Sequence, residues 1–153
     1  MIKVIAVGKL KEKSTQSLVS EYQKRLQTHH KLEIVELAKS KHKDHVIDKI
    51  VADESERILS RINSNDFVVL LDLKGKDIDS KMLSEKIEAV LDQGQTMVFV
   101  IGGSHGVNDK MRVRANFMWR ISLLTFPHQL VRILLLEQIY RGFAILKGHP
   151  YHK

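Results

Sequence analysis

Two kinds of hydrophobic pattern alternate along the chain, and each predicts a different element. The first kind is a short, nearly continuous apolar run rich in β-branched residues, which is typical of a strand covered on both faces of a sheet. The clearest examples are DFVVLLDL and TMVFVIGG. Five such runs predict strands, at residues 2–8, 31–38, 66–73, 96–103 and 120–126.

The second kind repeats apolar residues every three or four positions and therefore predicts amphipathic helices. In the first of these segments Leu18, Tyr22 and Leu26 form the stripe, and Ser14 is the expected N-cap. Helices are predicted at residues 14–30, 44–62, 80–94, 110–118 and 128–147. The regular alternation of strand and helix predicts an α/β domain with a mainly parallel sheet and helices on both faces. At 153 residues, the chain fits one domain over residues 1–153.

The last predicted helix, residues 128–147, is apolar on nearly every side. Such a helix must be buried on nearly every side, and a monomer of this size offers little room for that. One interpretation is an unusually central core helix. The pattern favours the other interpretation, a homodimer interface.

Charge and composition narrow the possible partners. The chain has 25 Lys and Arg against 18 Asp and Glu, a formal charge of +7, so nucleic acid is the first expected partner and an anionic membrane surface the second. No segment resembles a membrane span or a signal peptide, and we therefore expect a cytoplasmic protein without membrane insertion. Because the sequence has no cysteine, disulfides, thiolate metal sites and cysteine nucleophiles are excluded.

Three strand ends are the candidate ligand site, because ligands of open parallel sheets bind beyond the carboxyl ends of the strands. These ends are LLDLKG, VIGGSHG and ISLLTFPH. The pair Gly102 and Gly103 would let a ligand approach the backbone, although such a pair is also common in tight turns. We expect a side chain added at Gly103 to fill the floor of the pocket. The loops match neither the dinucleotide-binding nor the Walker phosphate motif.

The histidines and the C-terminal tail leave other interpretations open. The pairs His42/His45 and His149/His152 have a spacing that could share a metal ion, but no third ligand follows, so no metal site is predicted. The tail HPYHK, with Arg132 and Arg141 on the last helix, suits phosphate contacts and base stacking. A frayed terminus explains the same tail equally well.

The segments FVIGGSHGV, LTFPHQLVRILLLEQIYRGFAI and HPYHK, with LLDLKGK upstream, together resemble the RlmH (YbeA-type) branch of the SPOUT methyltransferases. The resemblance covers essentially the whole chain. It implies a homodimer with a C-terminal trefoil knot, which topological rules alone argue against. It also implies a reaction, the methylation by S-adenosylmethionine of N3 of a pseudouridine in helix 69 of large-subunit ribosomal RNA, on assembled ribosomes.

Carried over by position, the resemblance implies the residues of a cofactor pocket. They are Leu71, Leu73, Gly102, Gly103, Ser122, Leu123, Leu124, Thr125, Phe126 and Pro127. The candidates for catalysis are His128, Tyr151, His152 and Lys153. The candidates for RNA contact are Arg132, Arg141, His149 and Lys153. The resemblance further implies that the tail lies close to the cofactor pocket of the dimer.

Two other functions remain open at this point. A ribosome-binding or RNA-binding factor of the same fold would keep the basic surface without catalysis. A flavodoxin-like module would bind a flavin or another nucleotide, and an absorbance spectrum of the purified protein would reveal a retained flavin.

Overall fold

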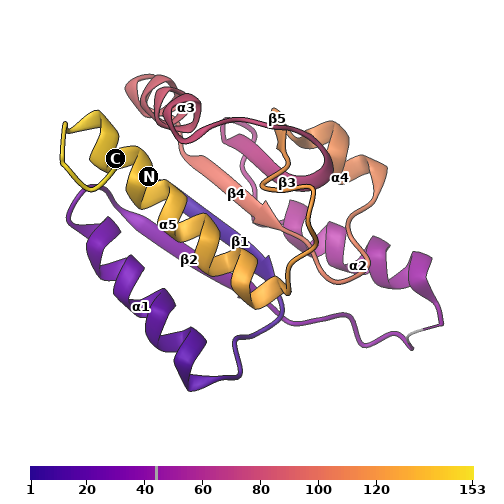
Figure 1. The fold of residues 1–153 in the computed structure, drawn as a ribbon. Helices are drawn as coiled ribbons and strands as arrows, with labels where there is room; N and C mark the ends of the chain where they lie inside the picture. The colour runs from indigo at the N-terminus through magenta and orange to yellow at the C-terminus, as the bar shows by residue number, and fades with distance from the viewer. Residues whose placement is uncertain (44) are drawn as a thin grey trace.

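The computed structural model describes residues 1–43 and 45–153 as one five-stranded sheet with helices on both sides (Figure 1). The strands are β1 (Ile2–Val7), β2 (Leu32–Leu37), β3 (Phe67–Lys76), β4 (Met97–Ile101) and β5 (Phe117–Trp119). The helices are α1 (Lys13–Gln27), α2 (Ile47–Leu59), α3 (Ser80–Asp92), α4 (Asp109–Arg114) and α5 (His128–Leu146). The predicted α/β class is confirmed.

The strands are all parallel, in the order β2-β1-β4-β3-β5. The amino ends of the first four start in register, with Ile2 opposite both Leu32 and Met97, and Phe67 also opposite Met97. Their carboxyl ends consequently meet along one edge of the sheet. The central strand β4 is buried at every position, which explains its uninterrupted apolar sequence.

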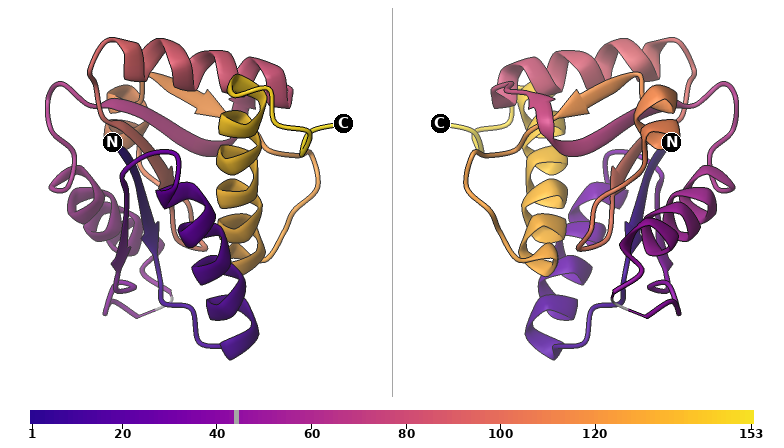
Figure 2. Two further views of the ribbon diagram at one scale, coloured as in Figure 1. Left: turned by 90° about the vertical axis from the view of Figure 1, so that its left-hand side faces the viewer. Right: turned by 90° about the vertical axis from the view of Figure 1, so that its right-hand side faces the viewer.

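The helices form two layers, one on each face of the sheet, and each layer packs on its own hydrophobic cluster. On one face α1, α3 and α5 cover the sheet with residues such as Leu26, Leu83 and Leu136. On the other face Ile58 of α2 and Met111 of α4 pack against Val68 and its neighbours. Figure 2 shows α2 on the opposite side of the strands from α1 and α5.

The helix α5 lies between α1 and α3 in this layer (Figure 1). Its inner residues, among them Leu135, Leu136 and Ile139, are fully buried, while Leu130 near its start is 45% exposed. Within one chain α5 is thus the central core helix that the sequence pattern allowed as one interpretation.

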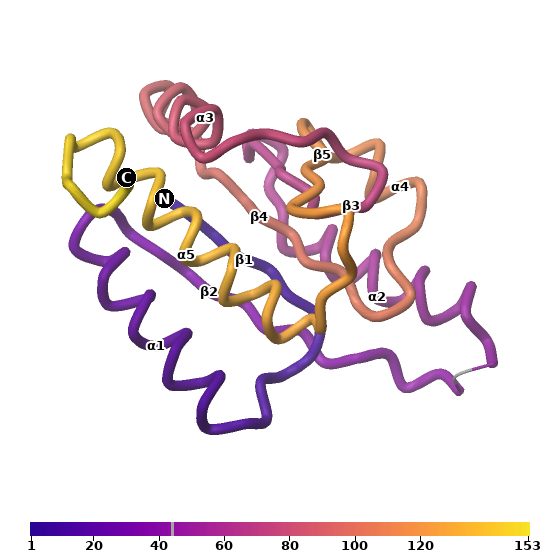
Figure 3. The backbone as a smooth tube through the Cα atoms, in the orientation of Figure 1, coloured from indigo at the N-terminus to yellow at the C-terminus, as the bar shows by residue number. Residues whose placement is uncertain are grey.

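The fifth predicted strand, residues 120–126, is wrong. The sheet ends with the short strand β5, and the bond from the Arg120 amide to the Lys76 carbonyl, at 2.9 Å, is the last in its ladder. The chain then forms a loop that leads to α5 (Figure 3). Two of its apolar residues, Leu123 and Leu124, are 76% and 70% exposed, so the run is apolar without being a buried strand.

Several predicted helix ends also differ from the observed ones. Helix α1 begins at Lys13, so Ser14 lies in its first turn and is not the N-cap. Helix α2 occupies a shorter span than the predicted residues 44–62, whose first residue, Asp44, lies outside the described part of the chain. Residues 110–118 divide between α4 and β5. Helix α3 matches well, because Asp79 accepts a hydrogen bond from the Met82 amide at 2.7 Å and Gly94, at φ +72°, follows its end.

Candidate functional site

A cavity of about 460 Å³ opens at the carboxyl ends of β3 and β4, beside the loop that leads to α5. This volume is in the range of small-molecule sites. The predicted cofactor residues that line the cavity are Leu71, Leu73, Gly102, Gly103, Ser122, Leu124, Thr125 and Phe126. Leu123 and Pro127 belong to the same loop but are not part of the lining. The three segments selected from the sequence therefore converge on one space, although the third is a loop and not the end of a strand.

The floor of the cavity is a tight glycine turn after β4. The Gly106 amide donates to the Gly103 carbonyl at 3.0 Å, and Gly106 has φ +78°, a conformation that favours glycine. A Cβ on Gly102 would lie 2.9 Å from Cγ1 of Val107. A Cβ on Gly103 would overlap Oε1 of Glu54 and lie 3.4 Å from Cγ1 of Val7. The expectation that a side chain at Gly103 would fill the pocket is therefore wrong, since it would point into the protein beneath the floor.

Glu54, on α2, is the residue beneath this floor, and it is not among the residues predicted from the sequence. It is only 3% exposed, and its Oε2 accepts a hydrogen bond from the Ser40 amide at 2.8 Å. Its neighbour Ser55 is fully buried and accepts a bond from the Asn108 amide at 3.0 Å. Helix α2 thus packs beneath Gly103 through Glu54 and bonds the chain just after the glycine turn through Ser55. An acidic residue on the apolar stripe of α2 was the only available signal.

The wall of the cavity contains ion pairs that connect distant segments. Asp72 at the end of β3 accepts a bond from Nε of Arg112 on α4 at 3.1 Å, and the carboxylate is 10% exposed. Asp77 accepts two bonds from Arg120, at 2.8 and 2.6 Å. The Arg120 guanidinium keeps the pKa of Asp77 below its ordinary value. The Asp72–Arg112 pair joins β3 to α4, and the Asp77–Arg120 pair joins the residue after β3 to the residue after β5.

His128, the first residue of α5, lines the cavity. Its pKa lies below the ordinary value, first because the surrounding residues partly withdraw the ring from solvent, and then because the positive charges of Lys39 and Arg132 disfavour protonation of the ring. The Gly102 backbone and the Glu54 carboxylate act in the opposite direction. The imidazole is consequently neutral near pH 7 and able to accept a proton.

Arg132 does not fit the predicted phosphate contact. Its side chain is 4% exposed, its guanidinium pairs with Glu36 on β2, and it donates to the Gly8 carbonyl at 2.9 Å. The arginine therefore joins the first turns of α5 to the ends of β1 and β2. Sequence reasoning could not see this role, because the partner lies 96 positions away.

The C-terminal tail folds back on the end of α5. Arg141 donates to Glu137 at 2.9 Å, lies 3.1 Å from Nδ1 of His152, and places its guanidinium carbon 4.8 Å from the centre of the Tyr151 ring. His149 is exposed, and its Nδ1 accepts a bond from the Tyr151 amide at 3.2 Å. The tail is therefore held against the end of α5 by side-chain contacts within the same chain.

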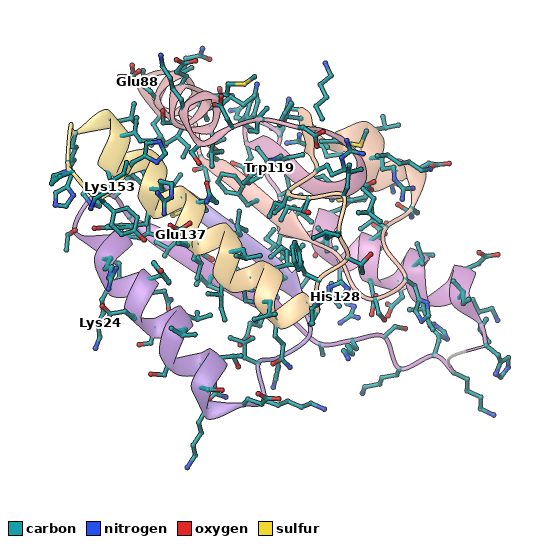
Figure 4. The ribbon with its side chains drawn as sticks, in the orientation of Figure 1. Lys24, Glu88, Trp119, His128, Glu137 and Lys153 are labelled. Carbon is teal, nitrogen blue, oxygen red and sulfur yellow. The ribbon has the colours of Figure 1, made fainter. Side chains whose placement is uncertain are left out.

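The tail and the cavity of one chain lie far apart. His128 begins α5, a helix about 28 Å long at 1.5 Å per residue, and the tail follows its last turn and folds back only as far as Glu137, near the middle of the helix. Figure 4 shows His128 and Lys153 at opposite ends of this helix. Tyr151, His152 and Lys153 accordingly do not reach the cavity of their own chain.

Among residues 1–43 and 45–153, no three His, Cys, Asp or Glu side chains are grouped to hold a metal ion. No helix in this part of the chain has the length and the apolar content needed to cross a membrane.

Comparison with known proteins gives a consistent result over the whole chain. A family model described as "Predicted SPOUT methyltransferase" matches residues 1–152. A protein of Bacillus pumilus named ribosomal RNA large subunit methyltransferase H is 46% identical over 157 aligned positions, covering 99% of both chains. A protein of the same name from Clostridium botulinum is 47% identical, again over 99% of both chains. A putative one from Methanococcus vannielii is 44% identical with the same coverage.

Proposed function

This chain belongs to the SPOUT methyltransferase family, and from that premise we propose that it methylates N3 of a pseudouridine in helix 69 of large-subunit ribosomal RNA. The family has a knotted fold, as the resemblance implied. The relatives carry names that specify ribosomal RNA of the large subunit as the substrate, which supports RNA methylation here. The position of the modified nucleotide within the RNA is proposed from the resemblance to the RlmH branch.

One observation carries the proposal: the predicted cofactor residues from three separated segments line a single cavity. S-adenosylmethionine carries no phosphate, so it needs apolar walls and backbone groups more than a phosphate-binding loop. Leu71, Ile101 and Phe126 supply such walls, and the glycine turn at Gly102 exposes backbone where the adenine edge would lie. The lining thus fits this cofactor.

When bound, the cofactor supplies an electrophilic methyl group on a sulfonium sulfur. The chain must align N3 with that methyl group and remove the N3 proton. We assign the proton to His128, because it lines the cavity and its lowered pKa keeps it unprotonated near pH 7. Tyr151 is the poorer candidate, since burial first and then hydrogen bonding raise its pKa above the ordinary value and keep the phenol protonated near pH 7.

We also propose that the active enzyme is a homodimer in which the tail of one chain completes the cavity of the other. Support comes from the separation of tail and cavity along α5. It also comes from exposed apolar side chains near the cavity, among them Leu73, Leu123 and Leu124 at 64%, 76% and 70% exposure. Such a patch is typical of a protein interface. In this arrangement His152 and Lys153 would contact the RNA substrate.

The test is methyl transfer from labelled S-adenosylmethionine to assembled ribosomes that lack the modification, with free large-subunit RNA as the comparison. We expect label at one pseudouridine, and only on assembled ribosomes. Cofactor binding without label on either RNA would show that the substrate is different. Absence of both cofactor binding and label would favour the alternative, a non-enzymatic ribosome-binding factor of the same fold.

A further inference from the structure

Two lysine-rich loops lie beside the cavity, at the carboxyl ends of β1 and β2. The first carries Lys9, Lys11 and Lys13, and the second carries Lys39, Lys41 and Lys43, so each has lysine at every second position. All six side chains are exposed. Figure 1 shows both loops along the same end of the molecule as the start of α5. We call these six residues the lysine rim.

The two loops of the rim start side by side because they follow the adjacent strands β1 and β2. Val7 pairs with Leu37, and the Gly8 amide donates to the Leu37 carbonyl at 2.7 Å. A Cβ on Gly8 would lie 3.4 Å from Cε of Lys39, so this side chain extends over the end of β1. Lys39 is also close enough to His128 to disfavour its protonation. The rim is therefore continuous with the entrance of the cavity.

Two carboxylates near the rim are engaged in the fold: Glu36 pairs with Arg132, and Glu54 is buried beneath the glycine turn. A third, Glu12, lies between two lysines of the rim in the sequence and is exposed, so it offsets one of the six positive charges. Within residues 1–43 and 45–153, none of the six lysines has a carboxylate within 4 Å. The rim consequently presents a positive surface that the described part of the chain does not neutralise.

Each loop is fixed in place by one of these two engaged carboxylates. Glu36 accepts a bond from the Leu10 amide at 3.2 Å, and Glu54 accepts one from the Ser40 amide at 2.8 Å. Gln16 adds a bond to the Leu10 carbonyl at 2.8 Å. Because these bonds connect the first loop to β2 and α1 and the second loop to α2, the backbone that carries the lysines keeps its position relative to the cavity floor, and its ordering cost is met by folding.

We propose that the lysine rim binds the phosphates of the RNA substrate next to the target nucleotide and thereby orients that nucleotide toward the cavity. This inference rests on the proposed function, since it assigns a docking surface to the same reaction. Lysine contacts to phosphate position a nucleic acid without reading its bases. Selection of the nucleotide would then depend on the shape of the cavity and the tail.

The experiment measures the affinity for ribosomes as a function of salt concentration. The test variant is Lys39→Gln/Lys41→Gln/Lys43→Gln. A matched control, Lys24→Gln/Lys31→Gln/Arg61→Gln, removes the same charge from the ends of α1 and α2 and the start of β2, at the opposite edge of the sheet. A third variant with arginine at positions 39, 41 and 43 keeps the charge of the rim.

We expect the slope of log Kd against log salt to fall by about two in the test variant, because each lost phosphate contact removes roughly 0.7 to 0.9. The control and the arginine variant should keep the slope of the unaltered protein. Cofactor affinity, measured by calorimetry, should be the same in all of them, which shows that the cavity is intact.

Equal slopes for the test variant and the control would overturn the proposal. So would an unchanged slope accompanied by lost binding to phosphatidylglycerol vesicles, which would assign the rim to a membrane surface. The proposed function fails in a different way, when the unaltered protein binds ribosomes but transfers no methyl group to them. In that case the comparison of slopes still decides what the rim binds.

Discussion

The Tyr151 hydroxyl donates a hydrogen bond to Oε1 of Glu137 at 3.0 Å, and this bond folds the C-terminal tail onto the last turns of α5. The Tyr151 ring also meets Tyr140 edge to face, with 4.8 Å between the ring centres. The tail is therefore ordered within one chain, at the end of α5 opposite its own cavity. In the proposed homodimer, the second chain would bring a tail and a cavity together.

Removing residues 151–153 should abolish methyl transfer and leave cofactor affinity unchanged. The physical reason is that these residues are distant from the cavity of their own chain and contribute nothing to its lining. Calorimetry with S-adenosylmethionine and transfer to ribosomes measure the two effects separately. A truncated protein that methylates ribosomes at the normal rate would show that the tail has no part in catalysis.

Mixed dimers test whether the tail acts on the partner's cavity. The truncated chain is combined with a chain carrying Thr125→Trp, whose larger side chain obstructs the cavity that Thr125 lines. Each homodimer should be inactive, while the mixed dimer should regain activity, because one of its sites combines an intact cavity with an intact tail. The two tagged chains can be separated by affinity purification. No recovery in a purified mixed dimer would contradict a shared site.

Gly103→Ala should destabilise the protein through Glu54. The new Cβ would overlap the buried carboxylate, so we expect a loss of about 1 to 3 kcal/mol in the free energy of unfolding. Glu54→Ala alone should also cost about 1 to 3 kcal/mol, because the Ser40 amide loses its acceptor. Urea denaturation of both single variants and of the double variant measures the coupling.

The double variant should lose less stability than the sum of the two single variants, by roughly 1 kcal/mol or more. Removing the carboxylate removes the atom with which the new methyl group collides. Additive losses would show that the clash at Gly103 is relieved in another way, for example by movement of the glycine turn.

The alternation of strands and helices was predictable because hydrophobic periodicity is a local property of the sequence. The strand β4 is buried throughout and reads as an uninterrupted apolar run. The segment from Ile121 to Phe126 looks similar but lines the cavity and its entrance. Composition alone does not distinguish an apolar strand from an apolar binding loop. The predicted fifth strand, residues 120–126, therefore begins after β5 has already ended.

The cavity was predictable in outline, while the residues that support it were not. Parallel strands bring their carboxyl ends to one edge, so the three strand ends could be grouped in advance. Glu54 and the Arg132–Glu36 pair depend on contacts between segments far apart in sequence. The sequence suggests a phosphate contact for Arg132, because its partner Glu36 cannot be recognised from spacing.

Arg132→Met should reduce stability without changing how ribosome binding depends on salt. The variant leaves the Gly8 carbonyl without its donor and Glu36 without its partner, and we expect a cost of roughly 2 to 4 kcal/mol. Glu36 is 37% exposed, so water will solvate its carboxylate in part. Urea denaturation gives the loss, and the salt series for ribosome binding gives the slope. A reduced slope with normal stability would restore the phosphate contact predicted from the sequence.

His128 should produce the acid limb of the pH profile for kcat/KM, which reports groups of the free enzyme. As the proposed base, it is active when unprotonated, so the rate should rise with pH as the ring loses its proton. Because its pKa lies below the ordinary value of 6.5, the midpoint of that limb should fall below 6.5. His128→Asn should remove the limb and lower kcat by about 10²- to 10⁴-fold, the usual contribution of a general base. The control variant Lys39→Gln removes one of the charges that lower this pKa, so its limb should move toward 6.5. An acid limb that persists unchanged in His128→Asn would assign the proton transfer to another group.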